Sequence, residues 1–261
     1  MYGWPLFAVS AAGACAGLAA WGAVAPSSEL FGPTWHHTPE ASQIALTFDD
    51  GPNPAHTPQL LRLLERYRAP ASFFLVGQFA RACPELVREI ADRGHSIGNH
   101  TETHVNLAFL PVSRIANELR ACQDNILRAL GFERDAAPLF MRPPFGYRGP
   151  QLWSAIRRAG LRGVAMWSLT CYDWKPQPTS RLIQRLGRVV DRRRLPAAAR
   201  TEMKSRRGGE IVVLHDGDAR RLGADRQHVL AALEYWLPRW RDAGYEFVTM
   251  NQLAGASPRS S

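Results

Sequence analysis

The chain of 261 residues is long enough for one large domain with a well-filled core, because 46% of its residues are hydrophobic. Its formal net charge of +9 would suit a nucleic-acid-binding protein, but residues Arg181–Arg207 hold ten basic and two acidic side chains and carry +8 of that charge. Zinc-finger spacing and aromatic-interleaved basic stripes are both missing, which excludes nucleic acid as the expected partner. The basic segment 181–207 instead favours a solvated helix that contacts an anionic surface.

The N-terminal residues Trp4–Ala25 form a run of 22 residues without a charged side chain. As a helix this run would be roughly 33 Å long, at about 1.5 Å per residue, and could cross a bilayer. Ala23-Val24-Ala25 also fits a signal-peptide cleavage pattern. Residues 1–25 are therefore interpreted as a retained membrane segment or a cleaved signal, with a buried or re-entrant helix as a third reading.

The rest of the chain is expected to be a linker (26–42), a main domain (43–254) and a short tail (255–261). In the main domain, strand-like apolar runs alternate with helical patterns, such as those over Thr57–Tyr67 and Val112–Leu130. The predicted strands are Gln43–Phe48, Ala71–Val76, Ser96–Asn99, Leu139–Arg142, Val164–Leu169, Glu210–His215 and Glu246–Met250. This alternation predicts an α/β protein with a deformed or partly open (β/α) barrel of about seven parallel strands.

Glycines follow three of the helical patterns at the position where a helix commonly ends in a left-handed residue. These are Gly131, Gly160 and Gly244. Glycine adopts this conformation without a steric penalty, so all three are expected to have positive φ angles.

Polar motifs follow five of the predicted strands. They are Asp49-Asp50, "GNHTETH" (Gly98–His104), "RPPFG" (Arg142–Gly146), "TCYDW" (Thr170–Trp174) and "LHD" (Leu214–Asp216). The carboxyl ends of parallel barrel strands share one mouth, where functional groups gather. We therefore expect these motifs to converge on a single site.

A divalent metal site is predicted from Asp50, His100 and His104. Two imidazoles and one carboxylate can bind a divalent ion and leave positions open for water and substrate. The four-residue spacing would bring the histidine rings together if the segment makes a helical turn. The alternative is that the histidines only cap or hydrogen-bond their loop.

Proton transfer is assigned to residues next to this metal set. If a metal takes up the charge of Asp50, then Asp49 can stay ionised and act as a base on a water molecule. Arg142 could pair with Asp49 and hold its pKa low. His215 is placed as the complementary acid, and Asp173 could keep it protonated. A base, an acid and a Lewis-acid metal are suited to hydrolysis of an unactivated amide.

The ordered motifs "TFDDGP", "GNHTETH", "RPPFG", "YDW" and "IVVLHD" resemble those of the NodB-homology polysaccharide deacetylases, carbohydrate esterase family 4. The resemblance covers about residues 44–253. It implies removal of N-acetyl groups from N-acetylglucosamine units of chitin-like or peptidoglycan chains, with zinc as the usual metal and cobalt or another divalent ion as alternatives. It also implies that the Phe145 N–H stabilises the oxyanion and that Trp174 and Val213 wall the acetyl pocket. We expect an envelope-associated enzyme, membrane-anchored or exported, whose catalytic domain lies outside the cytoplasm.

The sequence departs from the family pattern at Thr170, where many members have an aspartate, and at Phe145 and Val213, where tyrosine and leucine are common. These changes leave the predicted metal and proton-transfer groups intact but put the substrate in doubt. A small-molecule amidohydrolase and a catalytically silent glycan-binding protein therefore stay open as alternatives. An iron oxygenase could use the same three ligands but needs no second carboxylate beside them.

Overall fold

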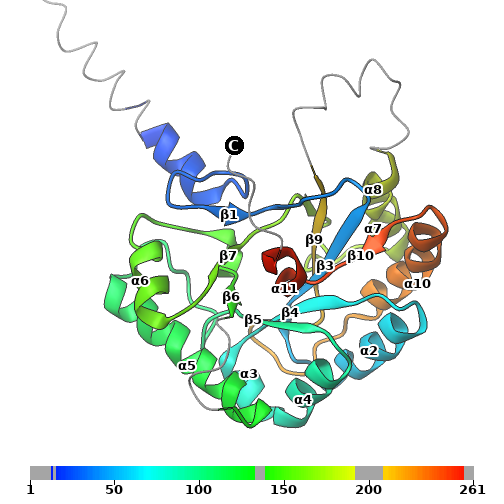
Figure 1. Cartoon of the computed structure of the whole chain (residues 1–261), viewed down its shortest axis with the longest axis horizontal. Coiled ribbons are helices and arrows are strands. Elements are labelled where there is room, and N and C mark those ends of the chain that lie inside the picture. Colours follow the sequence, from blue (N-terminus) through cyan, green and yellow to red (C-terminus); the bar gives the residue numbers. More distant parts are fainter. Residues whose placement is uncertain (1–12, 14–15, 133–138, 192–207, 256–261) are drawn as a thin grey trace, which may run out of the picture.

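The protein forms a nearly closed barrel of mostly parallel strands with helices packed around the outside (Figure 1). The structure is a computed structural model, and it describes residues 13, 16–132, 139–191 and 208–255. Its strands are β1 (Thr34–Trp35), β2 (His37–Thr38), β3 (Gln43–Gly51), β4 (Ala71–Leu75), β5 (Ser96–Asn99), β6 (Phe140–Met141), β7 (Gly163–Ala165), β8 (Leu169–Thr170), β9 (Gly209–His215) and β10 (Glu246–Phe247). Its helices are α2 (Thr57–Arg66), α3 (Gly77–Ala82), α4 (Pro84–Asp92), α5 (Val112–Leu130), η1 (Pro144–Gly146), α6 (Leu152–Ala159), α7 (Thr179–Leu186), α8 (Arg188–Asp191), α10 (Gln227–Asp242) and α11 (Met250–Gly255).

The strands follow the order β1-β7-β6-β5-β4-β3-β9-β2, and β10 and β8 pair with β3 and β9 respectively. Among the described residues, only the pairing of β2 with β9 is antiparallel. The predicted α/β barrel is therefore confirmed. Because its main strands run in one direction, their carboxyl ends lie at a common mouth.

The prediction of a single strand over Val164–Leu169 is wrong, because the structure has two strands there, β7 and β8. The chain leaves β7 and joins β8 beside β9, at the other end of the strand order. On the way, the Met166 N–H donates to the Trp35 carbonyl (2.7 Å) and the Ser168 N–H donates to the Ile211 carbonyl (3.0 Å). The segment thus bridges the two ends of the sheet and nearly closes the barrel.

Residues 26–42, expected to be a linker, contribute β1 and β2 to this sheet. β1 pairs with β7, and β2 pairs with β9, so one short strand lies at each end of the strand order. Strands of two residues have no measurable hydrophobic alternation, which explains why the sequence pattern does not reveal them.

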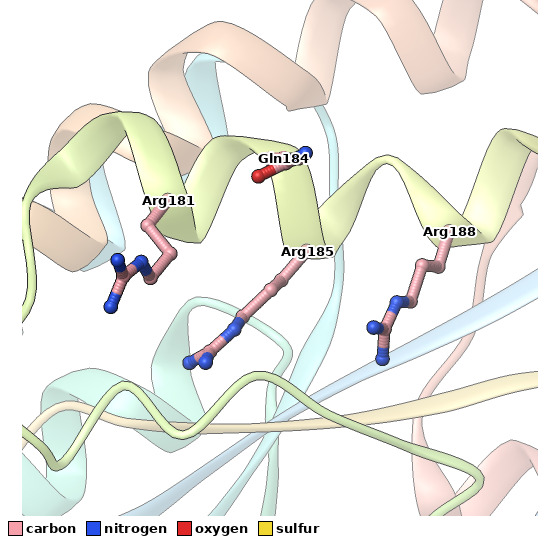
Figure 2. Close-up of a pocket in the computed structure, with 4 residues that line it drawn as sticks. All are labelled: Arg181, Gln184, Arg185 and Arg188. Carbon is pink, nitrogen blue, oxygen red and sulfur yellow. The ribbon is translucent and has the colours of Figure 1, made fainter.

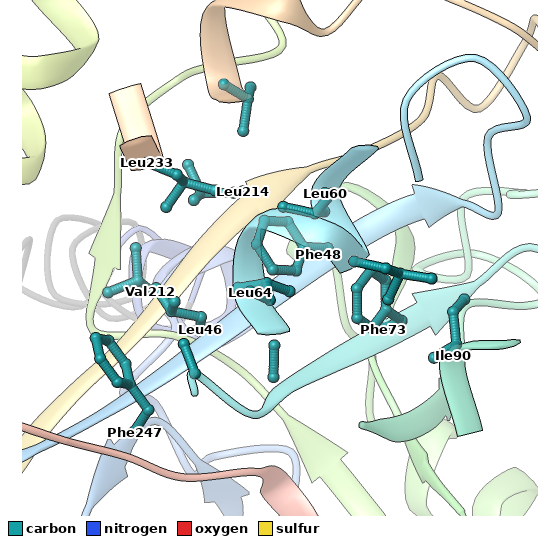
Figure 3. Close-up of a cluster of buried hydrophobic side chains, with 14 of the residues drawn as sticks. Leu46, Phe48, Leu60, Leu64, Phe73, Ile90, Val212, Leu214, Leu233 and Phe247 are labelled. Atoms are coloured by element: carbon teal, nitrogen blue, oxygen red, sulfur yellow. The ribbon is translucent and has the colours of Figure 1, made fainter. Parts of the chain in front are cut away.

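The apolar core has two layers because successive side chains of a strand point to opposite faces. On the outer face, Phe48, Val212 and Leu214 pack against Leu60 of α2 and Leu233 of α10 (Figure 3). Burial of such side chains contributes about 1.5–3 kcal/mol each, as an upper estimate. A smaller cluster fills the inside of the barrel and consists of Ala45, Phe74, Phe140, Ala165, Ile211, Val248, Met250 and Leu253.

The inner face of the barrel changes from apolar to polar towards the mouth. On β3 the inner residues are Ala45, then Thr47, then Asp49; on β9 Ile211 lies two residues from Val213, and His215 follows. The apolar cluster therefore forms the floor beneath the polar groups at the strand ends.

The predicted glycines lie directly after the helices or one residue beyond. Helix α5 ends before Gly131 (φ 73°), α6 before Gly160 (φ 70°), and Gly244 follows α10 with φ 78°. The expectation of left-handed glycines at these positions is confirmed.

Residues 16–24 are helical, and Arg148 fixes the end of this helix to the barrel. The buried Arg148 guanidinium donates to the carbonyls of Ser28 (2.9 Å), Gly22 (3.3 Å) and Ala25, and its backbone N–H donates to Ala23 (3.0 Å). Most of the predicted membrane segment lies outside the described residues, as do residues 192–207 of the basic segment and 256–261 of the tail. Among the helices that the structure describes, none is long and apolar enough for a membrane span.

Candidate active site

Asp49 and Asp50 reach the same mouth because β3 contains a bulge. The pairing with β4 runs from Asp49 with Phe74 to Gly51 with Leu75, so Asp50 is left out of the ladder. Asp50 has φ 68°, a left-handed value that is uncommon outside glycine. In a regular strand the two carboxylates would point to opposite faces of the sheet. The bulge lets both carboxylates face the histidines of the loop that follows β5.

Asp50, His100 and His104 come together as predicted. One ligand atom from each lies within 4.8 Å of the others. Asp50 Oδ1 is 3.2 Å from His104 Nε2 and 3.5 Å from His100 Nε2. All three side chains are at most 10% exposed, and Asp50 Oδ1 lacks a hydrogen-bond partner among the described residues. An orphaned buried carboxylate oxygen facing two imidazoles fits a divalent cation.

The loop also sets the imidazole tautomer that a cation requires. His100 Nδ1 lies 2.8 Å from the Arg142 carbonyl, so the protonated nitrogen donates there and the Nε2 lone pair faces Asp50. This is the usual arrangement in which a backbone acceptor orients a metal-binding histidine. Arg142 therefore contributes to the site through its backbone as well as its side chain.

The helical turn expected between the histidines is absent in this described loop. Thr101 (φ 67°) and His104 (φ 54°) are both left-handed, and Asn99 Oδ1 accepts the Thr101 N–H (2.9 Å). The Thr101 carbonyl in turn accepts the Gly77 N–H of α3 (2.9 Å). These contacts, rather than α-helical geometry, bring the His100 and His104 ring centroids to 4.9 Å.

Electrostatics favour the protonation states that bind a cation. Burial alone would raise the pKa of Asp50, but His100, His215 and His104 around it bring that pKa well below its usual range. Burial, together with the neighbouring His100, lowers the pKa of His104 to about 4. An ionised Asp50 and a neutral His104 are therefore present near neutral pH, which is the state that metal binding needs.

Asp49 pairs with the fully buried Arg142, as the sequence predicts. Arg142 Nη1 donates to Asp49 Oδ1 (2.8 Å) and Thr47 Oγ1 (2.7 Å). Its other nitrogens donate to the Ala165 (3.1 Å) and Met166 (3.0 Å) carbonyls. The guanidinium is thus held on several sides, and it keeps a fixed positive charge beside the Asp49 carboxylate.

His215 and Asp173 form the second predicted pair. His215 Nδ1 lies 3.0 Å from Asp173 Oδ1, and the His215 backbone N–H donates to Asp173 Oδ2 (2.7 Å). Burial alone would lower the His215 pKa, but Asp173, with Asp50 and Asp49 further away, raises it to about 9. His215 is the register partner of Asp49 on the neighbouring strand β9, so the imidazole and the carboxylate lie side by side at the ends of adjacent strands.

The remaining predicted site residues line the rim and the wall. Phe145, with φ 60°, is 54% exposed and puts its ring edge-on to His104 at 4.7 Å between centroids. Trp174 is 40% exposed and lies edge-on to His215 at 5.1 Å. Val213 is buried on the inner face of β9, two residues before His215. All three therefore lie near the candidate metal ligands or near His215.

Two buried residues were given no role from the sequence. Thr47 binds Arg142, and its place two residues before Asp49 on one strand face could have revealed this. Asp216 receives a hydrogen bond from Thr57 Oγ1, and its carbonyl accepts the Asn53 amide (2.8 Å). Burial raises the pKa of Asp216 to about 7 despite the Thr57 hydrogen bond. Asp216 thus joins the β9 end to the loop after β3, a contact for which the sequence carries no signal.

A candidate metal set, a candidate base and a candidate acid at the mouth of a parallel barrel are the groups that a hydrolase needs. Comparisons with known proteins agree. The family described as polysaccharide deacetylase matches residues 36–164. A peptidoglycan-N-acetylglucosamine deacetylase of Bacillus cereus is 34% identical over 222 residues, which cover 84% of this chain and 92% of that protein. A chitooligosaccharide deacetylase of a Bradyrhizobium species is 32% identical over 216 residues, which cover 80% of this chain and 90% of that protein.

A solved structure shares the fold. The family 4 acetyl xylan esterase from Clostridium thermocellum, in complex with a cobalt ion, superposes with a TM-score of 0.64 at 27% identity, covering 82% of this chain and 91% of that one. The chain therefore belongs to the polysaccharide deacetylase family, carbohydrate esterase family 4, and is a hydrolase of carbon–nitrogen amide bonds.

Proposed function

We propose that this enzyme is a metal-dependent deacetylase that removes N-acetyl groups from N-acetylglucosamine units of a chitin-like or peptidoglycan glycan. The observation that carries the proposal is the register of Asp49 with His215 beside the three candidate ligands. The exposed rings of Phe145 and Trp174 at the rim support an extended glycan over a small enclosed amide. A silent binding protein would need neither the buried Asp49–Arg142 pair nor the His215–Asp173 pair.

Asp50, His100 and His104 would hold a divalent cation, with zinc as the first candidate because the donor set is two imidazoles and one carboxylate. When bound, such a cation acts as a Lewis acid that polarises the amide carbonyl and acidifies water at neutral pH. The cobalt ion of the Clostridium thermocellum esterase supports a divalent metal here but does not select zinc.

The protein's own groups would move the protons. Asp49, held by Arg142, removes a proton from the attacking water. Arg142 donates a hydrogen bond to Asp49 Oδ1, so Oδ2 is the oxygen that acts as the base. The Phe145 backbone N–H would stabilise the negative charge on the carbonyl oxygen. His215, protonated and oriented by Asp173, then gives the proton on Nε2 to the leaving sugar amine. Trp174 and Val213 would enclose the acetyl methyl group.

We further propose that the catalytic domain acts outside the cytoplasm, next to the envelope glycan. The charge-free run Trp4–Ala25 supports either a membrane anchor or an export signal. An enzyme at the envelope would also meet a glycan as its substrate rather than a metabolite of the cytoplasm.

Acetate release tests the main proposal. The purified full chain, loaded with zinc or cobalt, is expected to release acetate from chitooligosaccharides, peptidoglycan or both, with metal content measured on the same sample. Chelation should abolish the release, and restored metal should recover it. Binding of both glycans without acetate release under any divalent metal would instead support the silent glycan-binding protein, and turnover of only small amides would support the amidohydrolase.

Replacing Asp173 with asparagine is expected to move the basic limb of the kcat/KM profile to lower pH. The reaction needs protonated His215, so activity falls as pH rises through the His215 pKa. Asp173 is the main group that raises this pKa to about 9, and its loss lowers the pKa. Rates on a chitooligosaccharide between pH 5 and about 10 measure the limb. Asp242→Asn, an exposed change on α10, is the control. An unmoved limb in Asp173→Asn would contradict the assignment of His215 as the acid.

A further inference from the structure

A row of arginines lies beside the active site and lines a shallow groove. Arg181, Arg185 and Arg188 project from the same side of α7 and α8 (Figure 2), and together with Gln184 they line a groove of about 340 Å³. Their spacings of four and three residues place them on one helix face, over roughly 10 Å of helix length. Like charges at these spacings repel one another, so an anion between them would stabilise the arrangement.

Two of these arginines have no acidic partner in the described parts of the chain. Arg181 and Arg188 are exposed, and neither takes part in any ion pair there. Arg185 is held in place because its Nη1 donates to the Cys171 carbonyl (2.9 Å) and to Gln177 Oε1 (2.9 Å). One fixed guanidinium, flanked by two that form no ion pair within the described residues, is a suitable receptor for carboxylate or phosphate groups.

Aromatic rings connect this row to the catalytic mouth. The Arg185 guanidinium lies 5.2 Å from the centroid of the Tyr172 ring. Tyr172 contacts Trp174 at 5.3 Å between centroids, and Trp174 contacts His215 at 5.1 Å. Tyr172 and Trp174 are 41% and 40% exposed, so their faces can receive sugar rings.

The backbone of Tyr172 is strained in a way that keeps its ring in this position. Its φ is 53°, a left-handed value for an aromatic residue, which persists only where the surroundings enforce it. Gln177 Nε2 donates to the Tyr172 carbonyl (2.7 Å), and Arg185 holds both Gln177 and the Cys171 carbonyl. The arginine row and the exposed ring are therefore built as one unit.

We propose that Tyr172 and the row Arg181–Arg185–Arg188 form an extended subsite for a glycan that carries anionic groups, carboxylate or phosphate, next to the acetylated unit that reacts. A neutral glycan would use only the aromatic part of this track. A lipid surface is less suited to it, because the track begins at His215 and reaches Arg185 through the exposed rings of Trp174 and Tyr172. The inference rests on the proposed function for the position of the reacting unit, but binding itself needs no turnover.

The experiment measures equilibrium binding of the full chain to four probes at low ionic strength. They are hyaluronan oligosaccharides, which carry carboxylates, phosphorylated maltooligosaccharides, neutral chitooligosaccharides of the same length, and vesicles with an anionic phospholipid. Arg181→Gln/Arg188→Gln is expected to weaken binding of one or both anionic glycans about tenfold, as two exposed ion pairs would, and to leave chitooligosaccharide binding unchanged. Whichever anionic glycan loses affinity identifies carboxylate or phosphate as the recognised group.

Two further variants separate the effect of the arginine row from a general loss of charge and from the contribution of the Tyr172 ring. Arg62→Gln/Arg114→Gln removes the same charge from exposed positions on α2 and α5 and should change none of the four affinities. Tyr172→Ala should weaken neutral and anionic glycans alike. Equal losses from both arginine pairs, or binding confined to vesicles, would overturn the proposal. Because no acetate is measured, a failed deacetylase assay would count against the proposed function alone, and unchanged binding would count against the subsite alone.

Discussion

Replacing Asp50 with alanine is expected to remove metal binding and to lower kcat/KM for deacetylation by about 1000-fold or more. A Lewis-acid metal contributes several kcal/mol to transition-state stabilisation, and each 1.36 kcal/mol corresponds to a factor of ten. Asp50 is the carboxylate of the three-residue set, and its Oδ1 is the atom that faces both imidazoles. Metal content after dialysis, together with acetate release, measures both effects.

A thermal readout separates metal loss from misfolding in Asp50→Ala. Zinc should raise the melting temperature of the wild-type protein, since a ligand at about 100 times its Kd stabilises the native state by about 2.7 kcal/mol. The same addition should leave the melting temperature of Asp50→Ala unchanged, while Asp242→Ala should respond like wild type. Full metal retention in folded Asp50→Ala would contradict the assignment of this residue as a ligand.

Replacing Asp49 with asparagine is expected to lower kcat by about 100- to 10,000-fold while metal content stays near the wild-type level. Asparagine keeps the shape of the side chain but cannot accept a proton from water. The change keeps all three candidate metal ligands, and Asp49 Oδ2 lies farther from His100 Nε2 (4.0 Å) than Asp50 Oδ1 does (3.5 Å). Substrate affinity should change little, so the loss should appear in kcat.

The same variant should also be less stable, because it leaves the buried Arg142 without its carboxylate partner. Breaking a buried ion pair by removing one member costs about 3–5 kcal/mol, although Thr47 and two carbonyls still hold the guanidinium. Kinetics must therefore be measured well below the melting temperature of the variant. Wild-type kcat in a folded, metal-loaded Asp49→Asn would show that another group is the base.

The sequence predicts the mouth of this site well because strand ends are easy to place. Apolar runs end where polar motifs begin, and parallel strands bring those ends together, so the pairs Asp49–Arg142 and His215–Asp173 can be expected from chain order alone. Residue types then limit the chemistry. The sequence therefore predicts candidate acid, base and cation-binding groups, whose roles stay proposals.

The backbone details of the site could not be predicted. Positive φ at Asp50, Thr101 and His104 leaves no mark in a hydrophobic pattern, because such angles at residues other than glycine depend on tertiary contacts. The expected helical turn failed for this reason, and the bulge in β3 went unnoticed. The division of Val164–Leu169 into β7 and β8 likewise depends on where the two ends of the sheet meet.

The hydrogen bonds of Arg148 determine what cleavage of the N-terminal segment would do to the protein. Its guanidinium takes acceptors from Gly22, Ala25 and Ser28, and it lies three residues beyond Phe145 in the same loop. A peptidase that cut after Ala25 would strip this buried cation of two of its three carbonyls and loosen the loop that shapes the rim. Trimmed and untrimmed molecules would then differ as catalysts as well as in their attachment, and recombinant material should be produced with residues 16–25 intact.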